Sequence, residues 1–486
     1  MSARGRTPVL LLALAGALAA APLLAQTDRS SPPKPGPVRL LKLPGIERLR
    51  LSNGLPVLLV GMHEVPVVEV ILVVRAGATA DPSGREGLAE MTADMLDEGA
   101  GGKDALALAD AIDYLGAQLE TEATWDASTV RLRVPVARFA DALPVMADIA
   151  LRPDFPEAEL ERLRKEALTD LLQARDVPGR IASRALARAV FGPGHRYGRP
   201  QEGDAASIAS FTAGELRTFH AARYSPSAAM LVVVGDVSSA MMPQLEKVFG
   251  AWSRRASELA APLVPAPRQL EGRTVWLVDK PGAAQSAIRV GRVGPSWADP
   301  GYAAAEVMNT LLGGSFTSRL NDNLREQHGY SYGAGSAFQR FRTGGLFFAS
   351  SDVQTDKTAP SLTEFVKELA RIRTPATLEE IERARSYTAL GYGGEFETTV
   401  QVARRMVDKV VFDLPDGFFE AFSPQALAVD TSGLEQAARA TIEPGKVAVV
   451  VVGDRAKVEA PLRALNLGSL RTLTVEDVMG PAPKVD

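Results

Sequence analysis

The pattern of apolar and polar positions alternates along the chain between strand-like and helical periodicity, which predicts interleaved strands and helices. Residues 67–74 are an almost continuous β-branched run, typical of a strand buried on both faces. Residues 129–134 alternate with period two, as in a strand with one buried face. Between and after them, residues 103–114 and 156–175 have helical patterns. The folded part is expected to begin near residues 51–60, where an Asn-Gly turn separates two apolar runs.

Comparison of the chain with itself reveals a repeat. Ala80-Asp81-Pro82 recurs as Ala298-Asp299-Pro300, and the Val-Val-Gly-Asp of residues 233–236 recurs at 451–454, both at an offset of 218 residues. Each copy spans about 210 residues, a suitable length for a pair of α/β domains. The pattern therefore predicts an α+β fold made of two homologous halves in tandem.

Composition changes along the chain predict the boundaries of these parts. An arginine-containing start followed by an apolar run reads as a secretory signal with cleavage near Ala25. The prolines between the two halves predict an extended linker that few contacts cross and that acts as a hinge. The predicted layout is a signal peptide at 1–25, a Pro-rich tether at 26–45, an N-terminal half at 46–255, the linker at 256–272 and a C-terminal half at 273–486.

Charge and hydropathy exclude two classes of partner. With 54 basic and 58 acidic residues, the net charge is −4, which argues against nucleic-acid binding. After the signal, no apolar run approaches twenty residues, so no membrane span is predicted. The signal indicates a periplasmic or secreted protein, and the absence of cysteine suits an oxidising compartment.

Zinc ligands are scarce. The chain has no cysteine and four histidines, of which no two are three or four residues apart. No segment therefore offers the paired nitrogen or sulfur ligands that zinc usually takes, and no metal is expected in this chain. His195 lies in a turn-rich loop, where we expect it to pack rather than to catalyse.

The segment 87–96 resembles the zinc helix of the pitrilysin and insulinase peptidases, in which two histidines and a glutamate form an H-x-x-E-H motif. Here Glu90 and Asp94 stand at the ligand positions and Ala93 at the general-base position. Counting along the later helix places Asp170 at the third ligand position. The three carboxylates are either an acidic helix surface or a cluster suited to a hard cation such as Ca²⁺ or Mg²⁺. Because the Ala93 methyl group cannot exchange a proton, the chain alone is not expected to hydrolyse peptides.

A second group of residues lies in the C-terminal half. Gly329 is a natural helix stop, so spacing alone makes Arg325 a partner of the helix dipole and Tyr332 an ordinary strand residue. Together with the preceding run of residues 313–320, however, they resemble the C-terminal half of the same family. That resemblance implies that Arg325 and Tyr332 hold the substrate and the developing oxyanion. It also implies that the loop of Gly313, Gly314 and Ser315 lies beside the substrate cavity.

The resemblance implies two-layer α/β sandwich domains in the fold of the mitochondrial-processing-peptidase-like metallohydrolases. It also implies a zinc-less, non-catalytic or half-site subunit that supplies Arg325 and Tyr332 to a zinc-bearing homologous partner, with short unfolded peptides as substrates. The alternative is a structural or peptide-binding scaffold subunit without any role in catalysis. A self-sufficient enzyme with a carboxylate metal site is disfavoured by Ala93.

Overall fold

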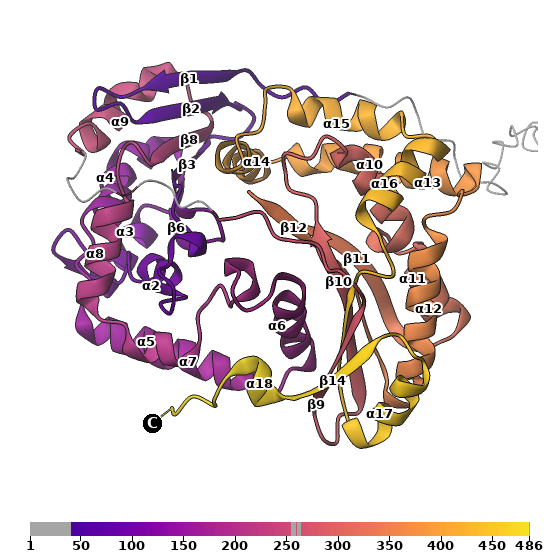
Figure 1. Cartoon of the computed structure of the whole chain (residues 1–486). Helices are drawn as coiled ribbons and strands as arrows, with labels where there is room; N and C mark the ends of the chain where they lie inside the picture. Colours follow the sequence, from indigo (N-terminus) through magenta and orange to yellow (C-terminus); the bar gives the residue numbers. More distant parts are fainter. Residues whose placement is uncertain (1–39, 254–258, 260–263, 486) are drawn as a thin grey trace, which may run out of the picture. The chain divides into compact units, whose positions relative to one another are not determined.

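The computed structural model describes residues 40–253, 259 and 264–485. The predicted signal peptide, most of the predicted tether and part of the predicted linker lie outside these residues. Residues from Leu40 onward form one unit. It contains two six-stranded sheets, shown in Figure 1.

The first sheet has the strand order β1-β2-β8-β3-β7-β6. Its central strand β3 pairs antiparallel with both neighbours, β7 and β8, whereas β2 and β8 are parallel. The strands are β1 (Ile46–Arg50), β2 (Pro56–Gly61), β3 (Val67–Val74), β6 (Gln118–Ala123), β7 (Ser128–Pro135) and β8 (Ala229–Gly235). A separate two-stranded ribbon joins β4 (Gly99–Ala100) to β5 (Lys103–Asp104).

The second sheet has the order β11-β12-β10-β13-β9-β14. Read from its other edge, five of its strands, β9, β13, β10, β12 and β11, repeat β2, β8, β3, β7 and β6 of the first sheet, and β2 and β9 start 218 residues apart. The edge strands differ, because β1 comes before its sheet in the chain and pairs antiparallel, whereas β14 comes after its sheet and pairs parallel. The duplication inferred from the two short motifs is thus confirmed in the topology. The strands are β9 (Thr274–Asp279), β10 (Gln285–Gly294), β11 (Ser331–Phe341), β12 (Gly344–Gln354), β13 (Ala448–Gly453) and β14 (Ser469–Thr474).

Helices occupy the segments between these strands. In the first half they are α2 (Leu88–Asp94), α3 (Ala105–Tyr114), α4 (Phe139–Leu151), α5 (Glu157–Ala174), α6 (Pro178–Phe191), α7 (Ala205–Ser210), α8 (Ala213–Arg223) and α9 (Met242–Phe249). In the second half they are α10 (Tyr302–Asn309), α11 (Arg319–Asn321), α12 (Thr358–Arg371), α13 (Leu378–Gly391), α14 (Thr399–Val411), α15 (Phe418–Leu427), α16 (Thr431–Thr441), α17 (Arg455–Ala464) and α18 (Val475–Met479). Two π-helical turns, η5 (Thr310–Gly314) and η6 (Asp322–Gln327), follow α10 and α11. The remaining short turns are the 3-10 helices η1 (Ala78–Ala80), η2 (Val136–Arg138), η3 (Arg196–Gly198), η4 (Ser239–Met241), η7 (Thr355–Lys357) and η8 (Tyr392–Phe396).

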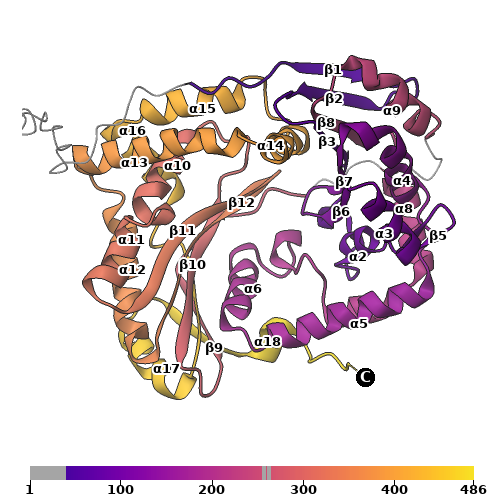
Figure 2. The same ribbon diagram turned by 180° about the vertical axis from the view of Figure 1, so that it is seen from behind.

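Each sheet is buried on both faces, which explains the continuous apolar strands. In β3, Val70 and Leu72 face the cluster that contains α4 and α9, while Ile71 and Val73 face a different cluster. In the second sheet, one face packs on helices that include α12 and α17. Figure 2 shows these helices on the opposite side of that sheet from α6.

The helix on the second face of each sheet comes from the other half of the chain. From the first half, α6 packs its Ile181 and Ala185 against β10 and β13. From the second half, α14 packs its Val402 and Met406 against β3 and β8. Figure 1 shows α6 beside β10, and α14 end-on beside β3. The two halves therefore exchange helices, and each sheet depends on both halves for its core.

Most described residues of the predicted linker are exposed, but Val264 and Leu270 pack, so the expectation that few contacts cross it is wrong. Val264 is buried between Tyr197 of the first half and Phe341 of the second. The Pro265 carbonyl accepts a hydrogen bond from His195, and Leu270 packs in the same cluster as α6. These contacts tie this stretch to both halves, which does not suit a free hinge.

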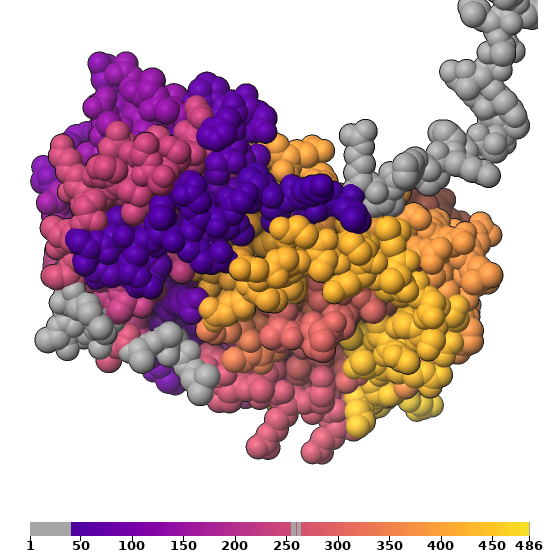
Figure 3. Space-filling view, turned by 90° about the horizontal axis from the view of Figure 1, so that it is seen from above, coloured from indigo at the N-terminus to yellow at the C-terminus, as the bar shows by residue number. Residues whose placement is uncertain are grey.

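The end of the predicted tether also packs. Leu41 and Leu43 lie against the cluster that contains α14 and α15. Figure 3 shows this indigo segment bordering the orange and yellow surface of the second half. Arg48 of β1 forms an ion pair with Asp416 there. Within the described residues, no helix is both long and apolar enough to cross a bilayer.

Candidate functional site

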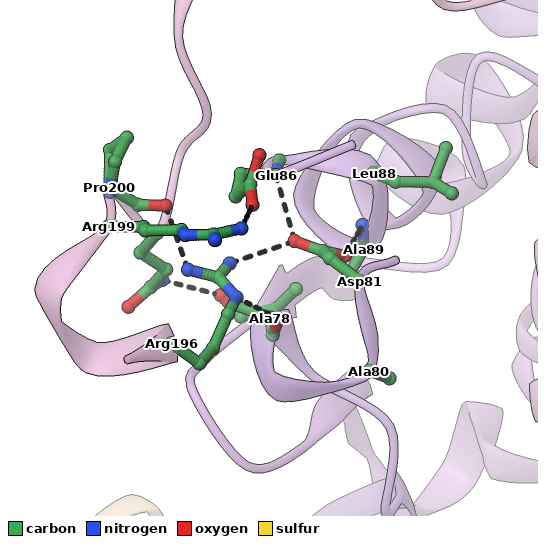
Figure 4. A network of polar contacts seen from close by, with 12 residues as sticks. Ala78, Ala80, Asp81, Glu86, Leu88, Ala89, Arg196, Arg199 and Pro200 are labelled. Atoms are coloured by element: carbon green, nitrogen blue, oxygen red, sulfur yellow. Dashed lines mark hydrogen bonds and ion pairs between the residues drawn. The ribbon is translucent and has the colours of Figure 1, made fainter. Parts of the chain in front are cut away.

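The counterpart of the predicted zinc helix is α2, and Asp81 holds its first turn. Gly87 precedes the helix at φ +91°, a left-handed conformation that favours glycine, and no side chain of that residue can cap the helix. The Asp81 carboxylate accepts hydrogen bonds from the backbone N–H groups of Gly87 at 2.9 Å and Ala89 at 2.8 Å (Figure 4). Its negative charge also complements the positive end of the helix dipole. This aspartate of the repeated motif therefore positions α2.

Arg196 completes the network around Asp81 (Figure 4). Its guanidinium donates to Asp81 at 2.9 Å and to the carbonyls of Ala78 and Pro200, and it stacks over the Trp125 ring at 5.0 Å. The Asp81 side chain is fully buried. Burial raises the pKa of Asp81 to about 6, although Arg196 acts in the opposite direction. Arg196 thus offsets part of the cost of burying this carboxylate.

A second arginine fixes the loop that follows. Arg199 donates to the Glu86 carboxylate at 2.6 Å and to the Ser83 hydroxyl at 2.8 Å. Burial alone would raise the pKa of Glu86. The hydrogen bonds from Arg199 and from two backbone donors outweigh burial and lower this pKa below its ordinary value. The backbones also meet closely, because a Cβ on Gly87 would lie 2.3 Å from the Glu202 carbonyl oxygen. The loop of residues 196–204 is therefore built rigidly onto the start of α2.

The degenerate motif positions have three different environments. Ala93 is fully buried in the core. Glu90 is half-buried, and burial, with repulsion from Asp94 and Glu202, raises its pKa to about 7, although a hydrogen bond from Gln201 opposes the shift. The Asp94 side chain is exposed to solvent. The surrounding protein nevertheless desolvates its carboxyl and raises its pKa to about 6, and repulsion from Asp97 and Glu98 adds to this shift. Burial and acidic neighbours raise the pKa of both carboxyls, and in the part of the chain that the structure describes neither forms an ion pair with a basic side chain.

Asp170, in contrast, is paired with a cationic side chain, the guanidinium of Arg180. Arg180 of α6 donates to both carboxylate oxygens, at 2.9 and 2.6 Å. These hydrogen bonds lower the pKa of Asp170. The carboxylate at the third ligand position is thus neutralised by the protein itself.

The residues present do not fit a zinc ion. No imidazole stands at either ligand position of α2, and a buried methyl group stands at the base position. Throughout the described residues, no three His, Cys, Asp or Glu side chains are arranged to hold a metal. Glu90, Asp94 and Asp170 therefore do not form the three-carboxylate cluster that was considered from the sequence.

The arginine and tyrosine of the second half lie at the surface. Arg325 is in the last turn of η6, 37% exposed, with its guanidinium 4.6 Å from the centre of the Phe316 ring and 3.5 Å from Glu326. Tyr332 is the second residue of β11 and is 92% exposed. Gly329, at φ +63°, ends the helical segment between them. Both side chains are free to contact another molecule.

The glycine loop has a packing explanation at one position. A Cβ on Gly313 would lie 2.3 Å from the Ser336 backbone nitrogen, so glycine is needed for β11 to approach η5. Gly314 is exposed and Ser315 is partly exposed, with its hydroxyl donating to the Thr310 carbonyl. A role for the three residues beside a substrate stays a prediction.

His195 packs, as the sequence predicted. Its Nε2 lies 2.9 Å from the Pro265 carbonyl oxygen, and its ring stacks on Phe191 at 5.8 Å between centroids.

Sequence reasoning missed the arginine network and two cavities. A cavity of about 520 Å³ lies along α6 and the loop of residues 198–202. A larger one, about 1040 Å³, lies against α10 and α13, the counterparts of α2 and α5. There Thr310 and Thr388 share a hydrogen bond of 2.8 Å, and Thr388 stands 218 residues after Asp170. The arginines and glycines of residues 192–203 were the available signal, but their partners are distant in sequence.

Two family models match the chain. The model described as insulinase (peptidase family M16) matches residues 57–200, which include α2. The model described as peptidase M16 inactive domain matches residues 210–387, which include Arg325 and Tyr332. Together they cover most of the folded chain.

Relatives and solved structures agree with this assignment. An uncharacterized zinc protease of Bacillus subtilis, YmxG, is 25% identical over 62% of this chain and 72% of its own length. An uncharacterized zinc protease of Rickettsia bellii is 24% identical over 69% of this chain and 80% of its own length. The crystal structure of a peptidase M16 inactive domain from Pseudomonas fluorescens is 26% identical, covers 84% of this chain and 98% of its own, and superposes with a TM-score of 0.78. A protease from Helicobacter pylori shares the fold: it is 20% identical, covers 85% of this chain and 100% of its own, and superposes with a TM-score of 0.79. The chain therefore belongs to peptidase family M16, the insulinase family, and the predicted fold class, two tandem α+β halves, is confirmed.

Proposed function

We propose that this protein is a zinc-less subunit of a heteromeric M16 peptidase and acts with a zinc-bearing homologue on short unfolded peptides. The observation that carries the proposal is the contrast between its two halves. The first half has lost the means to hold and use zinc at α2, whereas the second half presents Arg325 and Tyr332 to solvent. A zinc site in a partner would supply what this chain lacks.

The two exposed side chains have suitable chemistry. A guanidinium offers a rigid fork of charged donors, and a tyrosine hydroxyl offers a donor on a stiff ring, which suits the oxyanion of a tetrahedral intermediate. Phe316 limits the motion of Arg325 by stacking under it. Among the described residues, the Tyr332 hydroxyl has no hydrogen-bond partner of its own, so it is available to a substrate.

A scaffold subunit that only holds peptides is the second candidate. It is supported by the burial of Ala93 and by the pairing of Asp170 with Arg180, which give the former metal positions structural roles. Under either candidate, we place the mature protein in the periplasm or outside the cell, after cleavage near Ala25.

Complementation distinguishes the two candidates. We expect a mixture with the zinc-bearing homologue of the same organism to cleave an unstructured peptide faster than the two separate proteins do. In that mixture, Arg325→Ala or Tyr332→Phe should lower kcat by about 100-fold, the usual cost of losing one oxyanion donor. Association with the partner, measured by size-exclusion chromatography, should be unchanged.

Tyr114→Phe is the matched control, since Tyr114 is also a strongly exposed tyrosine but lies in the first half, where its ring contacts Arg138. It should leave turnover unchanged. An active mixture in which Arg325→Ala and Tyr332→Phe both match wild type would instead support the scaffold.

A further inference from the structure

The cavity of about 520 Å³ beside α6 has a basic wall. Its lining includes Arg180, Arg184 and Arg199, and across from them Arg289 of β10. Arg180 and Arg199 are occupied by Asp170 and Glu86. The other two arginines have donors to spare.

Arg184 is the unusual member of this wall. Its side chain is only 14% exposed, and its Nη1 is buried without a hydrogen-bond partner. Its nearest carboxylate among the described residues, Glu202, is 3.8 Å away and 41% exposed. A buried guanidinium that lacks hydrogen bonds is costly, and an anion that accepted them would recover that cost.

The first turn of α6 adds one further donor beside the cavity, the backbone N–H of Gly179. The helix starts at Pro178 after Val177, so no side chain caps it, and the N–H of Gly179 has no acceptor within the helix. A Cβ at Gly179 would lie 3.0 Å from Nη2 of Arg289, so glycine leaves room for this guanidinium. Arg289 uses Nη1 for the Ile288 carbonyl and for Asp352, and its Nη2 makes no hydrogen bond within the described residues. A helix start and two guanidinium groups with free donors therefore line one cavity.

The cavity also lies beside the end of the edge strand β6. Gln201 lines it and donates to the carbonyl of Ala123, the last residue of the edge strand β6. A peptide that paired with this edge would deliver a chain end or a nearby side chain to the cavity.

We propose that Arg184, Arg289 and the first turn of α6 form a subsite for a carboxylate of an unfolded peptide, either its C-terminus or an acidic side chain. The proposal rests on the proposed peptide-binding function. Both sources offer the same planar anion, which a guanidinium binds with two parallel hydrogen bonds.

Calorimetric titration of the full chain with matched peptides tests the subsite. Four peptides share one unstructured sequence. Two end in a free carboxylate and two in an amide, and within each pair one peptide carries an internal Glu where the other carries Gln. We expect one of the two carboxylates to tighten binding by about tenfold or more, the effect of a hydrogen bond to a charged group. Arg184→Leu should abolish that preference without lowering the thermal midpoint, because it removes a buried charge that lacks hydrogen bonds.

Two variants make the test specific. Arg188→Leu, one turn further along α6, removes an arginine that bonds the Asp477 carbonyl and is not part of this cavity wall, so it should keep the preference. Glu202→Gln removes the competing carboxylate but keeps Arg184, so it should strengthen the preference and remains informative if Arg184→Leu does not fold.

The outcomes separate the two proposals. A preference for the free C-terminus, or for Glu, that depends on Arg184 supports the subsite and identifies its ligand. Equal binding of all peptides overturns the subsite but leaves the peptide-holding function intact. If no peptide binds, both are wrong in their present form, and titration with inorganic phosphate shows whether an anion site remains.

Discussion

Two carboxylates at the former metal positions are expected to respond to pH in opposite directions. Burial raises the pKa of Glu90 to about 7 from its ordinary 4.5. Its contribution to stability is complete below pH 4.5 and is lost as pH rises through 7, because the charged form is the disfavoured one in the folded state. Hydrogen bonds from Arg180 lower the pKa of Asp170, so its contribution is present above the ordinary value of 3.8 and is lost as pH falls through the lowered pKa.

Glu90→Gln should therefore stabilise the protein at pH 8, by about 1 kcal/mol for a half-buried group, and should have no such benefit at pH 4.5. Asp170→Asn is the matched comparison: it should cost a small amount at pH 7, since the carboxylate is 58% exposed, and that cost should shrink as pH falls below 3.8 through the lowered pKa of Asp170. Chemical denaturation at several pH values measures both. A Glu90→Gln variant that is less stable than wild type at pH 8 would contradict the described environment of Glu90.

The motif positions themselves were readable from the sequence, but their partners were not. Glu90, Ala93, Asp94 and Asp170 follow from the resemblance of their segments to the zinc-binding helices of the family. The choice of Arg180 as the partner of Asp170 depends on the turn between α5 and α6, and Gln201 reaches Glu90 from a loop more than a hundred residues away. Side-chain pairing across such distances is set by tertiary packing, which local patterns do not record.

At the scale of elements, periodicity located several segments well. The strand predicted at 67–74 has those bounds, and the helix predicted at 156–175 is α5 (Glu157–Ala174). The amphipathic pattern of α6 shows that one face is buried, but it does not say which sheet buries that face. The exchange of α6 and α14 between the halves was therefore not foreseen.

This exchange predicts that the two halves unfold together. Ile181→Ala in α6 and Met406→Ala in α14 each remove a buried side chain from a sheet of the opposite half. Each should cost about 2–5 kcal/mol and shift one shared denaturation transition. Fluorescence of Trp252 in the first half and Trp276 in the second, each in single-tryptophan variants, follows both halves separately.

Leu172→Ala on α5 is the control, because that leucine is 40% exposed and its loss should change stability by less than about 1 kcal/mol. Two separate transitions, with Ile181→Ala shifting only that of the first half, would show that the exchanged helix does not couple the sheets.

At the scale of the whole molecule, repeated short motifs predicted the duplication, because they mark equivalent positions in two copies of one topology. The linker was misjudged because proline content indicates an extended backbone but says nothing about packing. Val264 and Leu270 are apolar residues in that stretch, and both are packed against the body of the protein. Any opening between the halves would have to break these contacts and separate the exchanged helices.

The central claim is that α2 no longer supports a catalytic metal, so that this chain depends on a partner for peptide hydrolysis. Elemental analysis of the purified protein after dialysis, together with turnover of an unstructured peptide by the same sample, tests it most directly. We predict no stoichiometric zinc and no cleavage, because Glu90, Ala93 and Asp94 offer neither imidazole ligands nor a general base. One tightly held zinc ion per chain, with cleavage that a chelator abolishes, would contradict the account.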